Sequence, residues 1–140
     1  MANINIIRIE SKLNSMFDGK IDMSDLERKK TADEIKKAFL SRALAAIAVM
    51  YETGIDIDMA AKSITDGFQD MGIDAVYCNE KQKQLILVQS KWRTEGNGGC
   101  SQNEVLTFVE GIKRIMSLEF EGANDKIKQK GREFTMSYGP

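Results

Sequence analysis

Histidine is absent from the chain, and proline and cysteine are scarce, with one proline and two cysteines among 140 residues. Without histidine there is no imidazole base, no imidazole metal ligand and no Ser-His or Cys-His catalytic pair. Cys78 and Cys100 lack the paired spacing of a zinc site, so we interpret both as ordinary reduced thiols. Catalytic chemistry in this chain must therefore use Asp, Glu, Lys or backbone groups.

A long hydrophobic run and a strong net charge are also missing. No apolar stretch approaches the roughly 20 residues of a membrane-spanning helix, and the N-terminus lacks the pattern of a signal peptide. The 20 basic and 21 acidic residues give a formal charge of −1, which removes bulk attraction to nucleic acid or anionic membranes as an argument. We expect a single domain over residues 1–140, located in the cytoplasm and without a membrane partner.

Helix signals come from the spacing of apolar residues and from capping boxes. A capping box pairs a hydroxyl residue with a carboxylate three positions later, and such boxes begin at Ser24, Thr31 and Ser101. The apolar residues after Thr31 and after Ser101 recur at helical spacing. The predicted helices are 4–17, one that starts at Ser24, 32–52, one or two turns from Asp58 through Ser63, one from Ser101 that ends before Gly122, and 124–134.

Two runs with strand character, 73–78 and 84–92, are joined by a polar turn of five residues and predict a β-hairpin. Residues 85–88 are apolar at consecutive positions, which indicates a strand covered on both faces and placed inside a sheet, not at its edge. The predicted fold class is therefore α/β or α+β, with a central β-hairpin sheet flanked by helices.

Three polar residues lie at the same end of this hairpin. Antiparallel pairing brings Asp74 opposite about position 88 or 89, and the period of two puts Gln89 and Lys91 on one face. A structural interpretation is an Asp74–Lys91 salt bridge with Gln89 bonded to a loop. A functional one is a hydrolytic site for Mg²⁺ or Mn²⁺, because carboxylate and amide oxygens are hard ligands and an ammonium can orient water. Spacing alone leaves both open.

A divalent cation at this position would need a second carboxylate, because one Asp and a neutral Gln leave most of its charge uncompensated. Asp66 and Asp70, in the loop before the first strand, are candidates. Glu34, on the long helix, is a third candidate.

The stretch around these residues resembles a known protein family. The similar segments are 64–67 (ITDG), Asp70, 72–77 (GIDAVY), 87–92 (LVQSKW), the glycines at 98–99 and 104–111 (EVLTFVEG). They look like the N-terminal nuclease region of the AIPR proteins of abortive phage infection and, more distantly, like the Mrr-type restriction endonucleases. Both groups belong to the PD-(D/E)XK nuclease superfamily, and the similarity covers residues 32–116.

The resemblance implies a restriction-endonuclease-like αβββαβ core and a metal-dependent endonuclease that acts on DNA or RNA in phage defence or restriction. It assigns Asp74 and Gln89 as ligands of Mg²⁺ or Mn²⁺ and Lys91 as the group that helps activate water. An acidic residue on the first core helix is common in the superfamily. The middle of that helix here, 39–43, has no carboxylate, and Glu34 lies about a turn and a half earlier.

The length of the chain is a second departure from the family. AIPR-like proteins continue beyond this region, whereas this sequence stops before the strand that completes the superfamily sheet. We therefore expect an N-terminal nuclease-like fragment with a helical extension at 1–30 and the core at 31–120, or a homodimer in which a partner chain supplies the missing part. DNA is the expected nucleic acid, with Arg93 and Lys113 as candidate contacts. The alternative function is a catalytically inactive nuclease-like domain that serves as a nucleic-acid-binding or oligomerisation module.

Overall fold

The computed structural model describes residues 3–138, which form five helices and a two-stranded antiparallel sheet. The elements, in chain order, are α1 (Ile4–Phe17), α2 (Ala32–Thr53), α3 (Ile57–Lys62), β1 (Ala75–Asn79), β2 (Gln84–Val88), α4 (Gln102–Met116) and α5 (Asp125–Tyr138). The mixed α/β class predicted from the sequence is confirmed.

The ends of the helices follow from local side-chain chemistry. Thr31 and Ser101 begin α2 and α4 with complete capping boxes, and α2 ends at Gly54, whose left-handed φ of 75° suits glycine. The helix predicted at Ser24 is wrong, because that segment forms turns. The Ser24 hydroxyl donates to the Asp22 carboxylate at 2.6 Å, and no run of apolar residues follows that a helix could bury.

The hairpin has the predicted register at the end that matters for the site. Ala75 pairs with Val88, and the Asp74 N–H donates to the Val88 carbonyl at 2.7 Å, so Asp74 lies opposite Gln89. On the other side of β1, Ile64 forms an isolated antiparallel bridge with Ala75. Within residues 3–138, β1 is thus the inner strand and β2 the edge strand. The prediction that the second strand lies inside the sheet is wrong.

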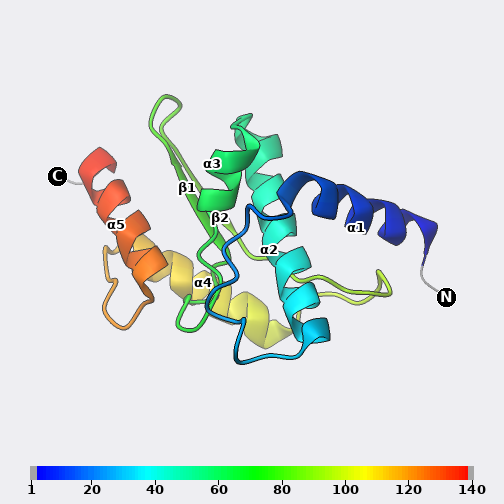
Figure 1. Ribbon diagram of the computed structural model, residues 1–140. Helices are drawn as coiled ribbons and strands as arrows, with labels where there is room; N and C mark the ends of the chain where they lie inside the picture. The colour runs from blue at the N-terminus through cyan, green and yellow to red at the C-terminus, as the bar shows by residue number, and fades with distance from the viewer. Residues whose placement is uncertain (1–2, 139–140) are drawn as a thin grey trace.

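Helices nevertheless cover both faces of the hairpin, which explains the continuous apolar run in β2 (Figure 1). Ile86 and Val88 pack against a core built mainly from α1, α2 and α3, whose fully buried members include Phe17 and Leu40. Leu85 and Leu87 pack on the opposite face against a second core with residues from α4 and α5. A strand can be covered by helices on both faces and still have a neighbouring strand on one edge alone. The apolar run therefore could not reveal which strand lies at the edge of the sheet.

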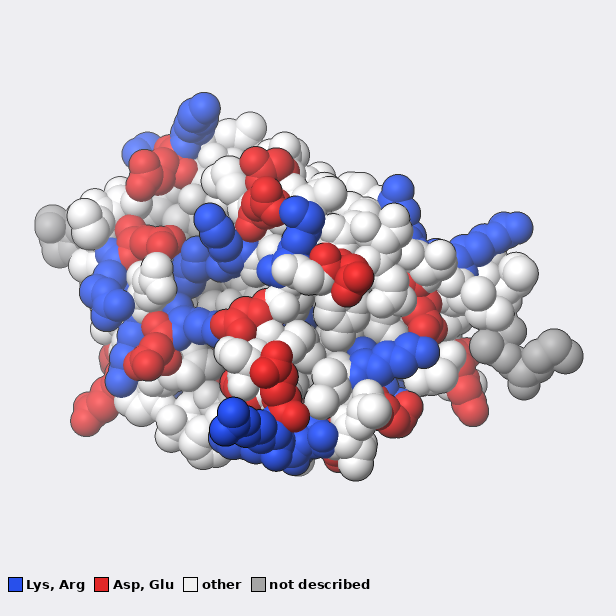
Figure 2. Space-filling view, viewed as in Figure 1, with Lys and Arg blue, Asp and Glu red and all other residues white. Residues whose placement is uncertain are grey.

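Charge is mixed over the surface, and Figure 2 shows Lys and Arg interspersed with Asp and Glu on the face of the molecule in view. Cys78 is half-buried in β1 and Cys100 is exposed, and neither forms a disulfide. None of the helices between residues 3 and 138 has the length and apolarity that crossing a bilayer requires.

Candidate functional site

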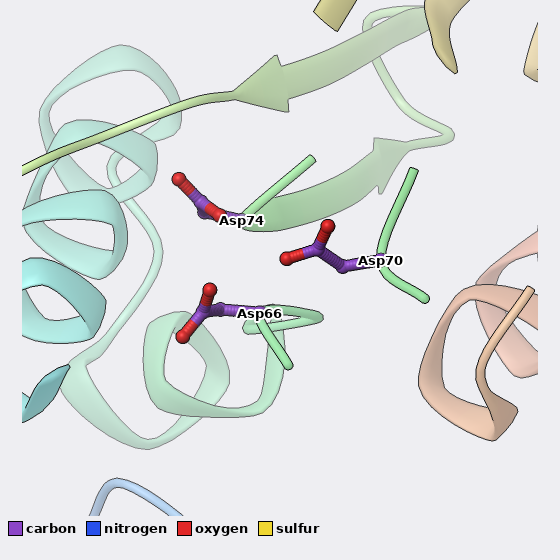
Figure 3. Close-up of side chains that lie close together, drawn as sticks. All are labelled: Asp66, Asp70 and Asp74. Carbon is purple, nitrogen blue, oxygen red and sulfur yellow. The ribbon is translucent and has the colours of Figure 1, made fainter. Parts of the chain in front are cut away.

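Three carboxylates converge beside the start of β1 (Figure 3). Asp66, Asp70 and Asp74 each offer one ligand oxygen, and these oxygens lie within 4.8 Å of one another. Two of the three come from the loop that precedes β1, and Asp74 is the residue directly before that strand. We call these residues the carboxylate cluster. The structure thus brings Asp74 together with the two loop aspartates that the sequence offered as further ligands.

Backbone hydrogen bonds fix the loop that carries the cluster. The N–H groups of Thr65 and Asp66 donate to the Asp74 carbonyl at 2.9 and 3.2 Å, which closes the loop at its base. The Asp70 carboxylate accepts from the N–H groups of Gly67 and Gly72 at 3.2 and 2.8 Å. The main chain therefore holds the loop and the Asp70 carboxylate in place.

Helix α4 packs closely against the far end of this loop. A Cβ at Gly111 would overlap the Met71 carbonyl oxygen, so only glycine permits this approach. Gly72 has a left-handed φ of 73°, and a Cβ there would lie 2.8 Å from the Thr107 Cγ2. These two glycines set the distance between α4 and the carboxylate cluster.

Burial and like charge make the cluster electrostatically costly. Burial raises the pKa of Asp74 to about 8, and the neighbouring Asp66 and Asp70 carboxylates add to this shift, while a 2.7 Å hydrogen bond from the Ser90 N–H opposes it. Burial also raises the pKa of Asp70. Without a cation, Asp74 therefore holds a proton at neutral pH, and a bound cation would replace that proton.

A buried arginine lies next to the cluster. Arg42, on α2, has only 1% of its surface exposed, and its Nε donates to the Asp66 carboxylate at 2.7 Å. Its two terminal nitrogens each donate to an oxygen of Asp25 at 2.9 Å, a bidentate pair. Arg42 occupies the mid-helix region where the family resemblance would place a carboxylate, and here it orients Asp66 instead.

Gln89 and Lys91 point toward α4. Ser90, between them, faces α2, since its hydroxyl donates to the Ser41 carbonyl at 2.6 Å. The Gln89 side-chain amide donates to the Glu104 carbonyl at 3.2 Å, and the Lys91 Nζ lies 2.5 Å from a Glu104 carboxylate oxygen. The structural interpretation of an Asp74–Lys91 salt bridge is thus wrong, because Glu104 is the partner of Lys91. The Lys91 ammonium also lowers the pKa of Glu104 to about 2.

The remaining predicted site residues lie outside the cluster. The Glu34 carboxylate accepts from the Thr31 N–H at 2.8 Å and so serves the capping box of α2. Arg93 donates to the Gly99 carbonyl at 2.7 Å, which fastens the glycine-rich loop, and Lys113 is exposed on α4. The aromatic side chain of Trp92 is buried in the first core, as a packing residue would be.

Comparison of the chain with models of known families, with curated proteins and with solved structures found no match. The argument for a function therefore depends on the geometry of the site. Sequence reasoning missed Arg42 and did not give Glu104 a role beyond its capping box. Their partners are 13 to 24 residues away along the chain, and no periodic pattern links such positions.

Proposed function

We propose that this protein is a metal-dependent phosphodiesterase, an endonuclease that acts on DNA or RNA in phage defence or restriction. The observation that carries the proposal is the convergence of three carboxylates at Asp74. In a chain without histidine, closely spaced carboxylates are the ligands suited to Mg²⁺ or Mn²⁺.

The donor set of the cluster fits such an ion. Mg²⁺ takes oxygen ligands, usually from one or two carboxylates together with water and substrate phosphate. In the part of the chain that the structure describes, one oxygen of Asp74 accepts from the Ser90 N–H and one oxygen of Asp66 accepts from the Arg42 Nε. Asp66, Asp70 and Asp74 would hold the ion, which supplies charge stabilisation for phosphodiester hydrolysis when bound.

Lys91 and Gln89 lie on the segment that directly follows β2, opposite Asp74, and this position sets their proposed roles. Both are attached to Glu104 at the start of α4, which fixes their direction. In the proposed reaction Lys91 orients the attacking water and offsets the negative charge that develops on the phosphate. Gln89 lies two residues before Lys91 and offers an amide group on the same side of the segment. Glu104 is a positioning residue that acts through Lys91.

We also propose that residues 31–120 form a restriction-endonuclease-like core. The order of α2, the bridge segment at Ile64, β1, β2 and α4 supports this, since it follows the helix, three strands and helix of that fold. After α4, the described chain continues as helix α5 where that fold has its last strand. The proposed core is therefore the first five elements of the fold without the sixth.

The test is cleavage of plasmid DNA and of structured RNA in Mg²⁺ and in Mn²⁺. The wild-type protein should cleave, and Asp74→Ala and Lys91→Ala should each abolish cleavage while circular dichroism shows an intact fold. Matched controls are Asp58→Ala and Lys81→Ala, which replace exposed residues away from the cluster and should cleave like wild type. Wild-type activity in either site variant would refute the assignment.

A second candidate function is an inactive nuclease-like module for binding or oligomerisation. It is favoured by the pairing of Lys91 with Glu104 and by the exposed apolar side chains of α4, where Val105 and Leu106 are 45% and 56% exposed. Metal binding separates the two, because a scaffold has no use for Mn²⁺ at Asp74. Absence of Mn²⁺ binding together with a concentration-dependent dimer would support the module.

A further inference from the structure

A cavity of about 830 Å³ adjoins the carboxylate cluster. Its walls are the N-terminal half of α2, the turns that precede α2, the loop at 66–68 and the first turn of α5. Asp66 lines the cavity and also belongs to the cluster, so the cavity reaches one of the proposed metal-binding carboxylates.

Several lysines line this cavity. Lys29 and Lys30 are exposed and, within residues 3–138, make no ion pair, and Lys37 and Lys126 add two further ammonium groups with exposed acidic partners. Five basic residues line the cavity against four acidic ones, Asp25, Glu34, Asp66 and Asp125, so the formal charge of its lining is +1. Arg42 pairs with Asp25 and Asp66, which leaves Lys29 and Lys30 as the positive groups placed to contact phosphates.

An exposed aromatic ring lines the same cavity. Phe68 is 85% exposed, although a phenyl ring normally gains free energy by burial. Its loop is firmly held, because Asn124 at the start of α5 donates to the Thr65 carbonyl at 3.0 Å and, through its own N–H, to the Gln69 carbonyl at 2.9 Å. Phe68 is thus a ring presented to solvent by an anchored loop.

From these three features we infer that the cavity binds a single-stranded stretch of nucleic acid, with its phosphates at Lys29 and Lys30 and one base stacked on Phe68. The inference deepens the proposed function, because it specifies the strandedness of the substrate. Stacking on an aromatic side chain requires an unstacked base, which single strands offer and duplexes do not. DNA and RNA share this chemistry, so both are tested.

The experiment is a fluorescence anisotropy titration with a labelled oligothymidylate, the matching oligouridylate and a duplex of the same length. EDTA is present throughout, so that binding is measured without metal and without cleavage. Phe68→Ala should weaken binding of the single strands about tenfold, as expected when one base loses its stacking partner. Removing Lys29 and Lys30 together should reduce the slope of log affinity against log salt by about 1.4.

Matched controls separate these effects from general loss of surface charge or apolar area. Met136→Ala removes an apolar side chain that is 88% exposed on α5, and the Lys81→Ala, Lys83→Ala double variant removes two lysines from the hairpin turn. Both should bind like wild type. The inference is overturned if Phe68→Ala binds single strands as wild type does, if the controls lose as much affinity, or if duplex binds more tightly than single strands.

The binding assay tests the cavity and the cleavage assay tests the phosphodiesterase, so each proposal can be refuted without the other. Single-strand binding that depends on Phe68, with no cleavage by wild type in Mn²⁺, would support the cavity and refute the phosphodiesterase. Cleavage that requires Asp74 but is unchanged in Phe68→Ala would support the phosphodiesterase and refute the cavity. Weaker binding of a mononucleotide than of the oligonucleotide is expected, since the lysines contact more than one phosphate, and equal affinity would contradict a strand-binding site.

Discussion

Asp74 and Lys91 lie on neighbouring segments at one end of the hairpin, yet their surroundings are opposite. Asp74 is half-buried beside two further carboxylates, and this raises its pKa to about 8. Lys91 is exposed and already paired with Glu104, whose pKa falls to about 2. The charge of Lys91 is thus already balanced by Glu104. The carboxylate cluster around Asp74, in contrast, concentrates negative charge that burial makes costly and that a bound cation would stabilise.

Replacing Arg42 should have the largest effect, because its buried guanidinium pairs with Asp66 of the carboxylate cluster. Arg42→Ala leaves Asp25 and Asp66 without their partner, and we expect it to lower the free energy of unfolding by about 3–5 kcal/mol. Urea denaturation measures this. Arg42→Lys keeps the charge without the bidentate geometry and should lie between wild type and alanine. The matched control is Lys20→Ala, whose exposed pair with Asp58 should contribute nothing measurable. Equal effects of Arg42→Ala and Lys20→Ala would contradict the account.

Gly111 tests whether the packing of α4 positions the cluster. Gly111→Ala places a methyl group against the Met71 carbonyl oxygen and should lower the free energy of unfolding by about 1–3 kcal/mol. Gly99→Ala is the control, because nothing lies within 4 Å of a Cβ at that position. Thermal or urea unfolding of both variants gives the comparison. A neutral Gly111→Ala would show that α4 does not hold the loop.

Between about pH 4 and 8, the pH dependence of stability should come mainly from the carboxylate cluster, where the pKa values of Asp74 and Asp70 are raised. The pKa of Asp74 rises from 3.8 to about 8 on folding, so the folded state binds the extra proton and the free energy of unfolding falls as pH rises between about 4 and 8. Asp74→Asn should flatten this part of the profile, measured by urea unfolding without metal in EDTA. A profile that is the same in wild type and Asp74→Asn would contradict the burial of Asp74 among like charges.

Replacing Glu104 should have the smallest effect on stability. Its pKa is depressed from 4.5 to about 2, so its pair with Lys91 is fully formed above pH 4.5 and is lost only as pH falls through 2. Glu104→Gln keeps an oxygen for the capping box and should melt like wild type, since an exposed ion pair adds little. Cleavage should nevertheless fall about tenfold as Lys91 loses its orientation. An unchanged rate in Glu104→Gln would remove its positioning role.

Much of the fold could be predicted because its signals are local. Capping boxes at Thr31 and Ser101 start helices where a periodic apolar run follows, and the same pattern at Ser24 failed because none does. The turn length predicted the hairpin register to within one residue, with Asp74 opposite position 88 or 89, and the structure places it opposite Gln89. The edge position of β2 could not be predicted, because an apolar run reports coverage of faces and says nothing about edges.

The site was predictable only in part. Asp66 and Asp70 lie in the loop before the strand that Asp74 opens, which was enough to name them as candidate ligands. The two charge pairings that decide the electrostatics, Arg42 with Asp66 and Lys91 with Glu104, join segments by tertiary packing. Such pairs depend on how helices dock on the hairpin, and a single sequence carries no signal for that.

The most direct test of the central claim is titration with Mn²⁺ by calorimetry above pH 8, where the Asp74 carboxylate is ionised. Wild-type protein should bind one ion, and Asp58→Asn, which changes an exposed aspartate paired with Lys20, should bind it equally. Asp74→Asn, shown to be folded by circular dichroism, should lose the binding. The same Mn²⁺ affinity in Asp74→Asn and wild type, or no binding to the wild-type protein, would contradict a cation site at the carboxylate cluster.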